Sequence, residues 1–331
     1  MNTSKTNYPE LNIIVMARER PIETARAIRA ISKIDFGCNV NLIVSDNPSS
    51  PEKALSNLPK EIKHKIRVPS GDTYWHFKTI ISESKTGWIL ITHDDDELLP
   101  ELGEYFKEYS CDPTVSVITG RSNIVRSDGR RIHSKSYEKR LRKSGLLSRS
   151  STAHTDLELK LFRFGSLFPA SAIIVRSEVL IKMLEMNIEV GLAYDIAYSM
   201  RVSKGSMVMF QGDAAIMNYY LHGGNSVFSD EAIGGLHADL AICRLDAISS
   251  GLLNPGFRDY LGLMTRVFKA RLISSAFKNK DKIKVLDKYV NAALNSHPNN
   301  LALLISSFSL DLPFTNFFIR KLLTWKVGKS L

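Results

Sequence analysis

Apolar residues in the amino-terminal third of the chain form short continuous runs, which alternate with segments of helical spacing. The runs predict strands at 11–17, 40–45, 64–68 and 87–92, and the segments between them predict helices at 24–34, 51–58 and 74–84. Runs that do not alternate with polar residues are typical of strands covered on both faces. The pattern therefore predicts an α/β fold, in which helices flank a mainly parallel sheet.

Polar side chains follow three of these strands at the point where each strand ends. Arg18 and Arg20 follow the first strand, Asp46 follows the second, and aspartates occupy positions 94–96 after the fourth. The carboxyl ends of parallel strands share one edge of the sheet, and ligands bind beyond that edge. We therefore expect these side chains to converge on one cleft.

The chain beyond Pro100 mixes helices and strands. The predicted elements are a helix at 101–109, a strand at 114–119, a hairpin turn at 127–129, helices from 177 and at 191–203, and a strand pair at 207–211 and 214–220. Residues 126–149 hold nine Lys and Arg against two acids, and we interpret them as a mobile surface segment.

The pattern changes near position 230, where strands give way to helices predicted at 231–251, 257–279, 281–295 and 300–308. We therefore expect an α/β domain at 1–230 and a basic helical region at 231–331. The segment 314–326 combines aromatic and basic residues, which suits either an interfacial membrane helix or a helix packed on its neighbours.

Charge is distributed unevenly along the 331 residues, whose net charge is +10. Residues 266–331 hold 12 Lys and Arg against three acids, so most of the excess lies there. A basic end predicts an anionic partner such as a membrane surface, a nucleic acid or a phosphorylated substrate.

The spacing of the cysteines and the length of the apolar runs indicate the cellular compartment of the protein. Cys38, Cys111 and Cys243 are far apart and show no metal-binding spacing, which favours a reducing compartment. Residues 1–10 lack an apolar leader, and no apolar run approaches the roughly 18 residues of a membrane span. We expect a cytoplasmic protein, at most peripheral on a membrane.

The aspartates at 94–96 are the strongest candidate for chemistry. Three adjacent carboxylates repel one another unless a cation offsets their charge. Carboxylate oxygens suit Mg²⁺ or Mn²⁺, which commonly bridge to substrate phosphates. A solvated acidic turn before a helix is the alternative. The position at the end of an apolar strand favours the metal, and the residues alone leave open which of the three aspartates bind it.

Five segments occur in an order that resembles glycosyltransferase family 2, whose members have the GT-A fold and use nucleoside-diphosphate sugars. These segments are LNIIVMARERP at 11–21, VNLIVSDNPSS at 40–50, HDDDELLP at 93–100, GLAYDIAYSMRV at 191–202 and YYLHGGNSV at 219–227. The chain departs from the commoner family pattern in two places. The first turn is Ala-Arg-Glu-Arg rather than Thr-Tyr-Asn, and Tyr194 precedes Asp195 where the family usually has Glu.

The resemblance implies a GT-A-type mixed, mainly parallel sheet flanked by helices, with a carboxy-terminal helical extension. It implies roles for nine residues: nucleotide contacts from Ala17, Arg18, Arg20, Asp46, Asp94 and Asp95, metal ligation by Asp94, Asp96 and His222, and general-base catalysis by Asp195. The metal would be Mn²⁺ or Mg²⁺.

The implied activity is inverting transfer of a hexosyl group from a nucleoside-diphosphate sugar, most often a UDP-sugar. The implied acceptor is a glycan or a lipid-linked hydroxyl in surface-polysaccharide synthesis, at the inner face of the cytoplasmic membrane.

Two other classes stay open. The first is another metal-dependent enzyme acting on activated phosphates, such as a nucleotidyltransferase, although the turn at 17–21 lacks the glycines of a phosphate loop. The second is a non-enzymatic basic protein that binds membranes. A nucleic-acid binder is disfavoured because no recognised signature is present. A dinucleotide-dependent dehydrogenase is disfavoured because no G-x-G-x-x-G follows a strand.

Overall fold

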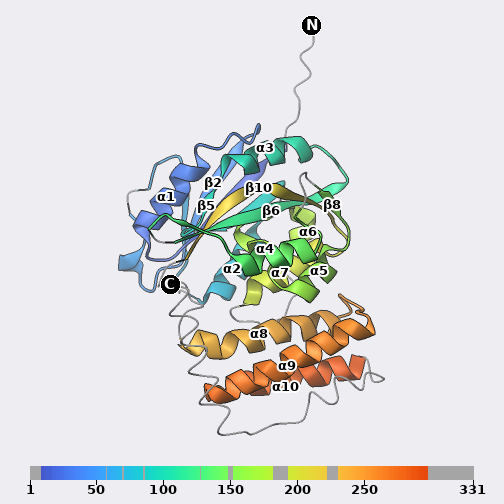
Figure 1. Ribbon diagram of the computed structural model, residues 1–331. Helices are drawn as coiled ribbons and strands as arrows, with labels where there is room; N and C mark the ends of the chain where they lie inside the picture. Colours follow the sequence, from blue (N-terminus) through green and yellow to red (C-terminus); the bar gives the residue numbers. More distant parts are fainter. Residues whose placement is uncertain are drawn as a thin grey trace. The chain divides into compact units, whose positions relative to one another are not determined.

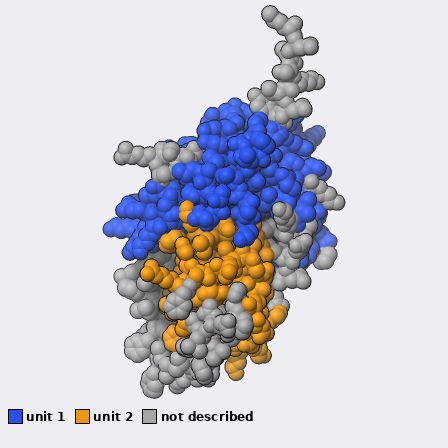
Figure 2. All heavy atoms as spheres, turned by 90° about the vertical axis from the view of Figure 1, so that its right-hand side faces the viewer, with its two compact units in different colours: residues 1–157, 166–185, 202–220 blue, residues 158–165, 186–201, 221–331 orange. Residues whose placement is uncertain are grey.

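The computed structural model describes residues 9–56, 58–68, 71–84, 86–126, 128–147, 152–181, 193–221 and 230–296 (Figure 1). Two compact units are present (Figure 2): residues 1–157, 166–185 and 202–220 form the first, and residues 158–165, 186–201 and 221–331 form the second. The boundary at position 230 stays a prediction. His222, the helix predicted at 300–308 and the segment 314–326 lie outside the described residues.

The first unit is built on a mixed sheet. Its strands are β1 (Leu11–Ala17), β2 (Val40–Asp46), β3 (Lys63–Ile66), β4 (Trp88–His93), β5 (Glu97–Leu98), β6 (Val115–Arg126), β7 (Arg131–Ile132), β8 (Thr152–His154), β9 (Ile174–Arg176) and β10 (Met207–Leu221). Their order is β3-β2-β1-β4-β9-β6-β10-β5, with β7 beside β6 and β8 beside β10. The strands from β3 to β4 run parallel, while β9 is antiparallel to both β4 and β6.

Helices cover both faces of this sheet. The unit holds α1 (Pro21–Ile31), α2 (Thr73–Glu83), α3 (Pro100–Tyr109), α4 (Lys135–Lys143) and α6 (Ser177–Ile181), with 3₁₀ turns at Pro51–Lys53 and Ala170–Ala172. Buried residues of α1 and α3 share one core with Ile13 and Val15 of β1. In that core the Trp88 ring meets Phe106 edge-on, with 5.8 Å between their centroids. Ile14 points to the other face, where it lines a hollow together with Ile80 of α2.

The second unit is helical in its described part. It contains α7 (Tyr194–Ser203) up to Arg201, most of α5 (Leu157–Phe164), and the carboxy-terminal helices α8 (Asp230–Ser249), α9 (Phe257–Ala276) and α10 (Lys280–Ser296). The last three pack together and bury Leu245, Leu263 and Leu286 completely. The mixed, mainly parallel sheet, its flanking helices and the carboxy-terminal helices confirm the fold class predicted from the sequence.

Two local predictions were wrong. The strand pair at 207–211 and 214–220 is one continuous strand, β10, because Gly212 and Asp213 lie within the strand instead of forming a turn. Gly120 of β6 allows β10 to approach closely, since a Cβ at this position would lie 2.8 Å from Cβ of Gln211. The segment 126–149, interpreted as mobile surface, contains the helix α4, which Ser134 caps by accepting a hydrogen bond from the backbone of Tyr137.

Among the described residues, no helix combines the length and the apolar character needed to span a membrane.

Candidate functional site

The polar residues that follow β1, β2 and β4 lie at one edge of the sheet, as the strand pattern predicted. Ala17 is opposite Asp46 in the β1–β2 ladder, and Met16 is opposite His93 in the β1–β4 ladder. Two further backbone bonds extend these ladders, from the Asn47 N–H to the Ala17 carbonyl at 3.0 Å and from the Asp94 N–H to the Met16 carbonyl at 3.0 Å. The register of three strands therefore brings these positions together.

Arg20 joins two of the clustered aspartates. Its Nη2 lies 2.7 Å from Oδ1 of Asp94, and its Nη1 lies 2.5 Å from Oδ2 of Asp95. The backbone N–H of Arg18 donates to Oδ2 of Asp94 at 3.1 Å. Asp94 is thus held by the turn after β1. Burial raises the pKa of Asp94 to about 7, against the opposing effect of the Arg20 charge.

Asp96 is held by a different part of the chain. Ser171 donates from Oγ to Oδ2 of Asp96 at 2.7 Å. Burial raises the pKa of Asp96 far above its ordinary value, and repulsion from Asp95 acts in the same direction. A carboxyl group that is 2% exposed and lies beside other carboxylates is a strong acceptor for a cation, because a cation offsets both the burial and the repulsion.

His93, Asp95 and Asp96 form the group best suited to a metal ion. One ligand atom from each lies within 4.8 Å of the other two, and Nδ1 of His93 lies 3.7 Å from Oδ2 of Asp96. Burial lowers the pKa of His93, which favours the neutral ring that ligates metals. An imidazole and two carboxylates suit Mn²⁺, so the residues present fit the implied metal. Asp94 is not in this group.

A second layer of contacts fixes the backbone of the cluster. Arg26 donates from Nη2 to the Asp95 carbonyl at 2.8 Å, and its guanidinium lies 4.0 Å from the centroid of the Tyr220 ring. The Tyr220 hydroxyl and the Asn218 amide donate to Oε2 of Glu97 at 2.9 and 2.8 Å. Residues of β10 therefore position the loop that carries the aspartates.

Asp46 presents an acceptor atom to the same edge. Its Oδ2 accepts from the Leu55 N–H at 2.7 Å and lies 3.3 Å from Nε2 of His64. Its Oδ1 is buried and has no hydrogen-bond partner among the described residues. A buried carboxylate oxygen without a donor is costly unless a ligand supplies one.

The loop before α2 is attached to the end of β2. The Asn47 side chain donates to the Gly71 carbonyl at 2.8 Å and accepts from the Gly71 N–H at 3.1 Å. Gly71 leaves room for the Trp75 ring, because a Cβ at this position would lie 2.3 Å from that ring and would force it to move. Trp75 is left 40% exposed beside this loop, whereas His76 is buried and contacts Ser45 Oγ at 2.9 Å.

Asp195, the predicted general base, belongs to the second unit. It lies in the first turn of α7, where its Oδ1 accepts from the Ile196 N–H at 2.8 Å. Burial raises the pKa of Asp195 to about 6. A carboxyl group with this pKa is poised to accept a proton near neutral pH.

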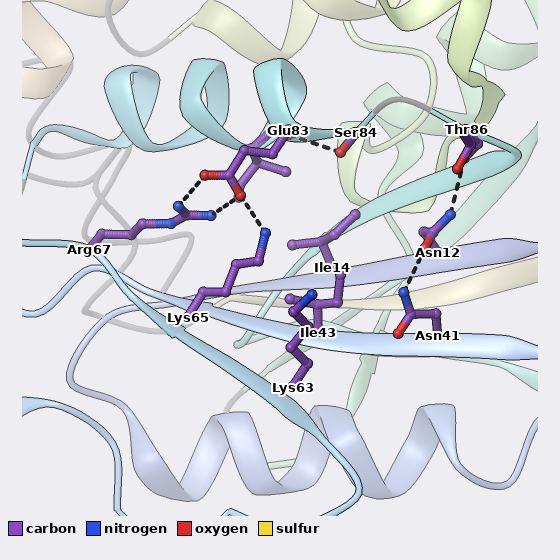
Figure 3. A pocket seen from close by; sticks show the side chains of 11 residues that line it. Asn12, Ile14, Asn41, Ile43, Lys63, Lys65, Arg67, Glu83, Ser84 and Thr86 are labelled. Carbon is purple, nitrogen blue, oxygen red and sulfur yellow. Dashed lines mark hydrogen bonds and ion pairs between the residues drawn. The ribbon is translucent and has the colours of Figure 1, made fainter.

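A polar hollow of about 180 Å³ lies on the first unit, toward the amino-terminal halves of β1 and β2 (Figure 3). Lys65 and Arg67 line it, and both form ion pairs with Glu83 across it. Three cations, Lys63, Lys65 and Arg67, and one acid, Glu83, line the hollow, so it is basic overall. The aspartates lie at the opposite, carboxyl ends of these strands, and the chemistry of the acidic cluster therefore belongs elsewhere.

Several residues of the site were not found from the sequence. Ser171 and Arg26 carry no local signal, because they reach the cluster only through the fold. His93 adjoins the aspartates and is a recognised ligand type, so its side chain could have been included. The sequence reasoning instead paired Asp94 with Asp96.

The mixed sheet, its flanking helices and the carboxy-terminal helices form a GT-A-like fold. Solved structures agree with this fold. Residues 1–349 of S. aureus TarS in complex with UDP-GlcNAc match with a TM-score of 0.59 and 11% identity, covering 97% of this chain and 92% of that one. The complex of the same protein with UDP matches with a TM-score of 0.51 and 10% identity over the same shares. No protein-family model and no curated protein matches the sequence. The GT-A resemblance drawn from the sequence is therefore confirmed at the level of the fold.

Proposed function

We propose that this protein is a metal-dependent glycosyltransferase. It transfers a hexosyl group, with inversion, from a UDP-sugar to a hydroxyl group of a glycan or lipid-linked acceptor. One observation carries the proposal: His93, Asp95 and Asp96 bring their ligand atoms within 4.8 Å of one another at the carboxyl edge of a GT-A sheet. TarS, which shares this fold, binds UDP-GlcNAc and UDP.

The acidic cluster would hold Mn²⁺ or Mg²⁺ through His93, Asp95 and Asp96. When bound, such an ion supplies positive charge to a departing diphosphate. Arg20 supports the same function from the protein, because its guanidinium already lies against Asp94 and Asp95 and carries donors suited to phosphate oxygens.

Asp46 is proposed to recognise the base of the nucleotide. The N3–H of uracil is a donor, and Oδ1 of Asp46 is a buried acceptor that no described residue satisfies. Oδ2 of Asp46 is held by Leu55 and His64, so the free oxygen has a fixed direction. Ala17 and Arg18 line the same edge through their backbone.

Asp195 is proposed as the general base. Its carboxylate accepts the proton of the acceptor hydroxyl while that oxygen attacks the anomeric carbon. The bond from the anomeric carbon to the diphosphate oxygen breaks, and its electron pair leaves with the diphosphate. This step leaves Asp195 protonated and the anomeric configuration inverted.

A donor screen tests the proposal. The protein is incubated with UDP-, GDP- and dTDP-sugars, and release of nucleoside diphosphate is measured with Mn²⁺, with Mg²⁺ and with excess EDTA. We expect release from a UDP-sugar that depends on the metal and that EDTA abolishes. Release of pyrophosphate from nucleoside triphosphates instead would indicate a nucleotidyltransferase. Absence of nucleotide binding in the presence of metal would remove the enzymatic proposal.

Two variants sharpen the test. Asp195→Asn should bind UDP normally and lose transfer, whereas Asp213→Asn, an exposed carboxylate on β10, should change neither. Transfer that survives in Asp195→Asn at the normal rate would exclude Asp195 as the base.

A further inference from the structure

Helix α4 is amphipathic and is anchored to the first unit by its inner face. Leu141 is buried on this face. Tyr137, one turn earlier, donates from its hydroxyl to the Leu167 carbonyl at 3.0 Å and accepts from the Ser122 N–H at 3.2 Å. These contacts reach two different segments of the first unit. They fix the direction in which the outer face of α4 points.

The exposed residues of α4 are four cations and one serine, and the half-buried Glu138 lies beside them. Lys135, Lys139, Arg142 and Lys143 are all exposed, and their spacing of four, three and one residues places them on one side of the helix. Among the described residues, none of these four takes part in an ion pair that would neutralise it. The one acid of the helix, Glu138, contacts His133 at 3.1 Å.

The same side chains line a surface hollow of about 450 Å³, together with His133 and Glu138. We call this hollow the basic groove. From Lys135 to Lys143 the helix advances about 12 Å, at about 1.5 Å per residue, so positive charge recurs at each turn along the groove. A single small anion would contact only part of this row.

We propose that the basic groove binds a linear polyanion, a chain that carries phosphate groups at regular intervals. Two observations favour a chain over a membrane surface. The outer face of α4 exposes no apolar side chain that could enter a bilayer, whereas interfacial helices combine cations with apolar residues. The four cations also line a hollow, which suits a chain better than a flat surface. The proposal uses only the first unit and does not depend on the transferase activity.

The experiment measures binding of the full-length protein to fluorescently labelled inorganic polyphosphate of defined length by fluorescence anisotropy. We expect binding that weakens on the order of tenfold or more between about 50 and 200 mM salt, because about 0.7 counterions are released for each phosphate neutralised. Replacing all four cations by Gln (K135Q, K139Q, R142Q and K143Q) should weaken binding by at least about tenfold, since Gln preserves helix propensity and removes the charge.

A matched variant removes the same charge elsewhere. Lys33, Lys60, Arg258 and Lys269 are exposed and lie outside α4, so K33Q, K60Q, R258Q and K269Q should change the affinity by less than about threefold. Circular dichroism establishes that both variants fold. If the fourfold α4 variant does not fold, K139Q and R142Q are tested singly, and each should weaken binding measurably.

Three outcomes would overturn the proposal. The first is equal loss of binding in the two fourfold variants, which would show a general charge effect. The second is no binding of polyphosphate at low salt. The third is binding to phosphatidylglycerol vesicles that depends on α4 while polyphosphate does not compete, which would assign the surface to a membrane.

Discussion

Ser171 Oγ donates a hydrogen bond of 2.7 Å to Asp96 Oδ2, although the two residues are 75 positions apart in the chain. Both side chains are buried, so the bond is shielded from water. It leaves Asp96 with a fixed orientation beside His93 and Asp95. Groups that orient a metal ligand in this way commonly change metal affinity by about 10- to 100-fold when removed.

Ser171→Ala is therefore expected to weaken Mn²⁺ binding by about tenfold, because Asp96 loses the donor that orients it. Titration calorimetry with Mn²⁺ measures the effect. Ser144→Ala is the matched control, since Ser144 is also buried and donates to a backbone carbonyl, that of Leu141, at 2.9 Å. Equal Mn²⁺ affinity in wild type and Ser171→Ala would show that this bond does not support a metal site.

Asp46→Asn is expected to weaken UDP binding by about tenfold or more. In the wild type, the Leu55 N–H donates to Oδ2 of Asp46. In the variant, the single amide oxygen of Asn keeps this hydrogen bond, so the amide NH₂ takes the place of Oδ1. A donor would then face the N3–H donor of uracil, and a lost buried hydrogen bond costs about 1–3 kcal/mol. Calorimetric titration with UDP and with CDP checks this. Affinity for UDP that is unchanged would remove Asp46 from base recognition.

The transfer rate is expected to depend on pH through Asp195. Burial raises the pKa of Asp195 to about 6, and a general base acts only when it is deprotonated. The rate under saturating donor should therefore fall about tenfold for each pH unit below about 6 and level off above it. A pH–rate profile measured between about pH 5 and 8 tests this, and a flat profile would argue against a carboxyl base with this pKa.

Glu83→Gln is expected to lower the free energy of unfolding by about 1 kcal/mol at pH 7 and low salt, a value limited by the solvent exposure of the pair. Hydrogen bonds from Arg67, and then from Lys65, lower the pKa of Glu83 to about 2, below its ordinary value of 4.5. A depressed pKa in the folded state stabilises the protein above pH 4.5, and this contribution is lost as the pH falls through about 2.

Urea unfolding of wild type and Glu83→Gln at several pH values measures this difference. It should shrink as the pH falls below 4.5 and as salt is added. Glu104→Gln serves as the control, because Glu104 pairs with Lys107 at a more exposed site. A difference that does not vary with pH would show that the ion pairs in Figure 3 do not carry the effect.

Much of the fold could be predicted from the sequence, because local patterns decide it. The continuous apolar runs at 11–17 and 87–92 became β1 and β4, since buried parallel strands leave no polar alternation. The helix α4 was missed because a strongly charged segment looks like a surface loop, although Tyr137 and Leu141 already mark a buried face at a spacing of four residues.

The site could be predicted only in part. Asp46 and the aspartates at 94–96 were found because strand ends are visible in the sequence. The contacts of Ser171 and Arg26 were not, since they depend on the approach of segments that are distant in the chain. The orientation of Asp94 toward Arg20 was also hidden, because neighbouring residues in a turn point in different directions.

The number of residues in β10 fixes the distance between the positions where it pairs with β8 and with β5. Met209 pairs with Ala153 of β8 near one end, and Asn218 pairs with Glu97 of β5 near the other. Side chains alternate between the two faces of a strand, so one inserted residue between these points would exchange the faces of Met217 and Asn218. The insertion would detach Asn218 from Glu97 and displace Tyr220 from Arg26. Evolution of this protein is therefore expected to tolerate substitutions along the middle of β10 far more readily than changes in its number of residues.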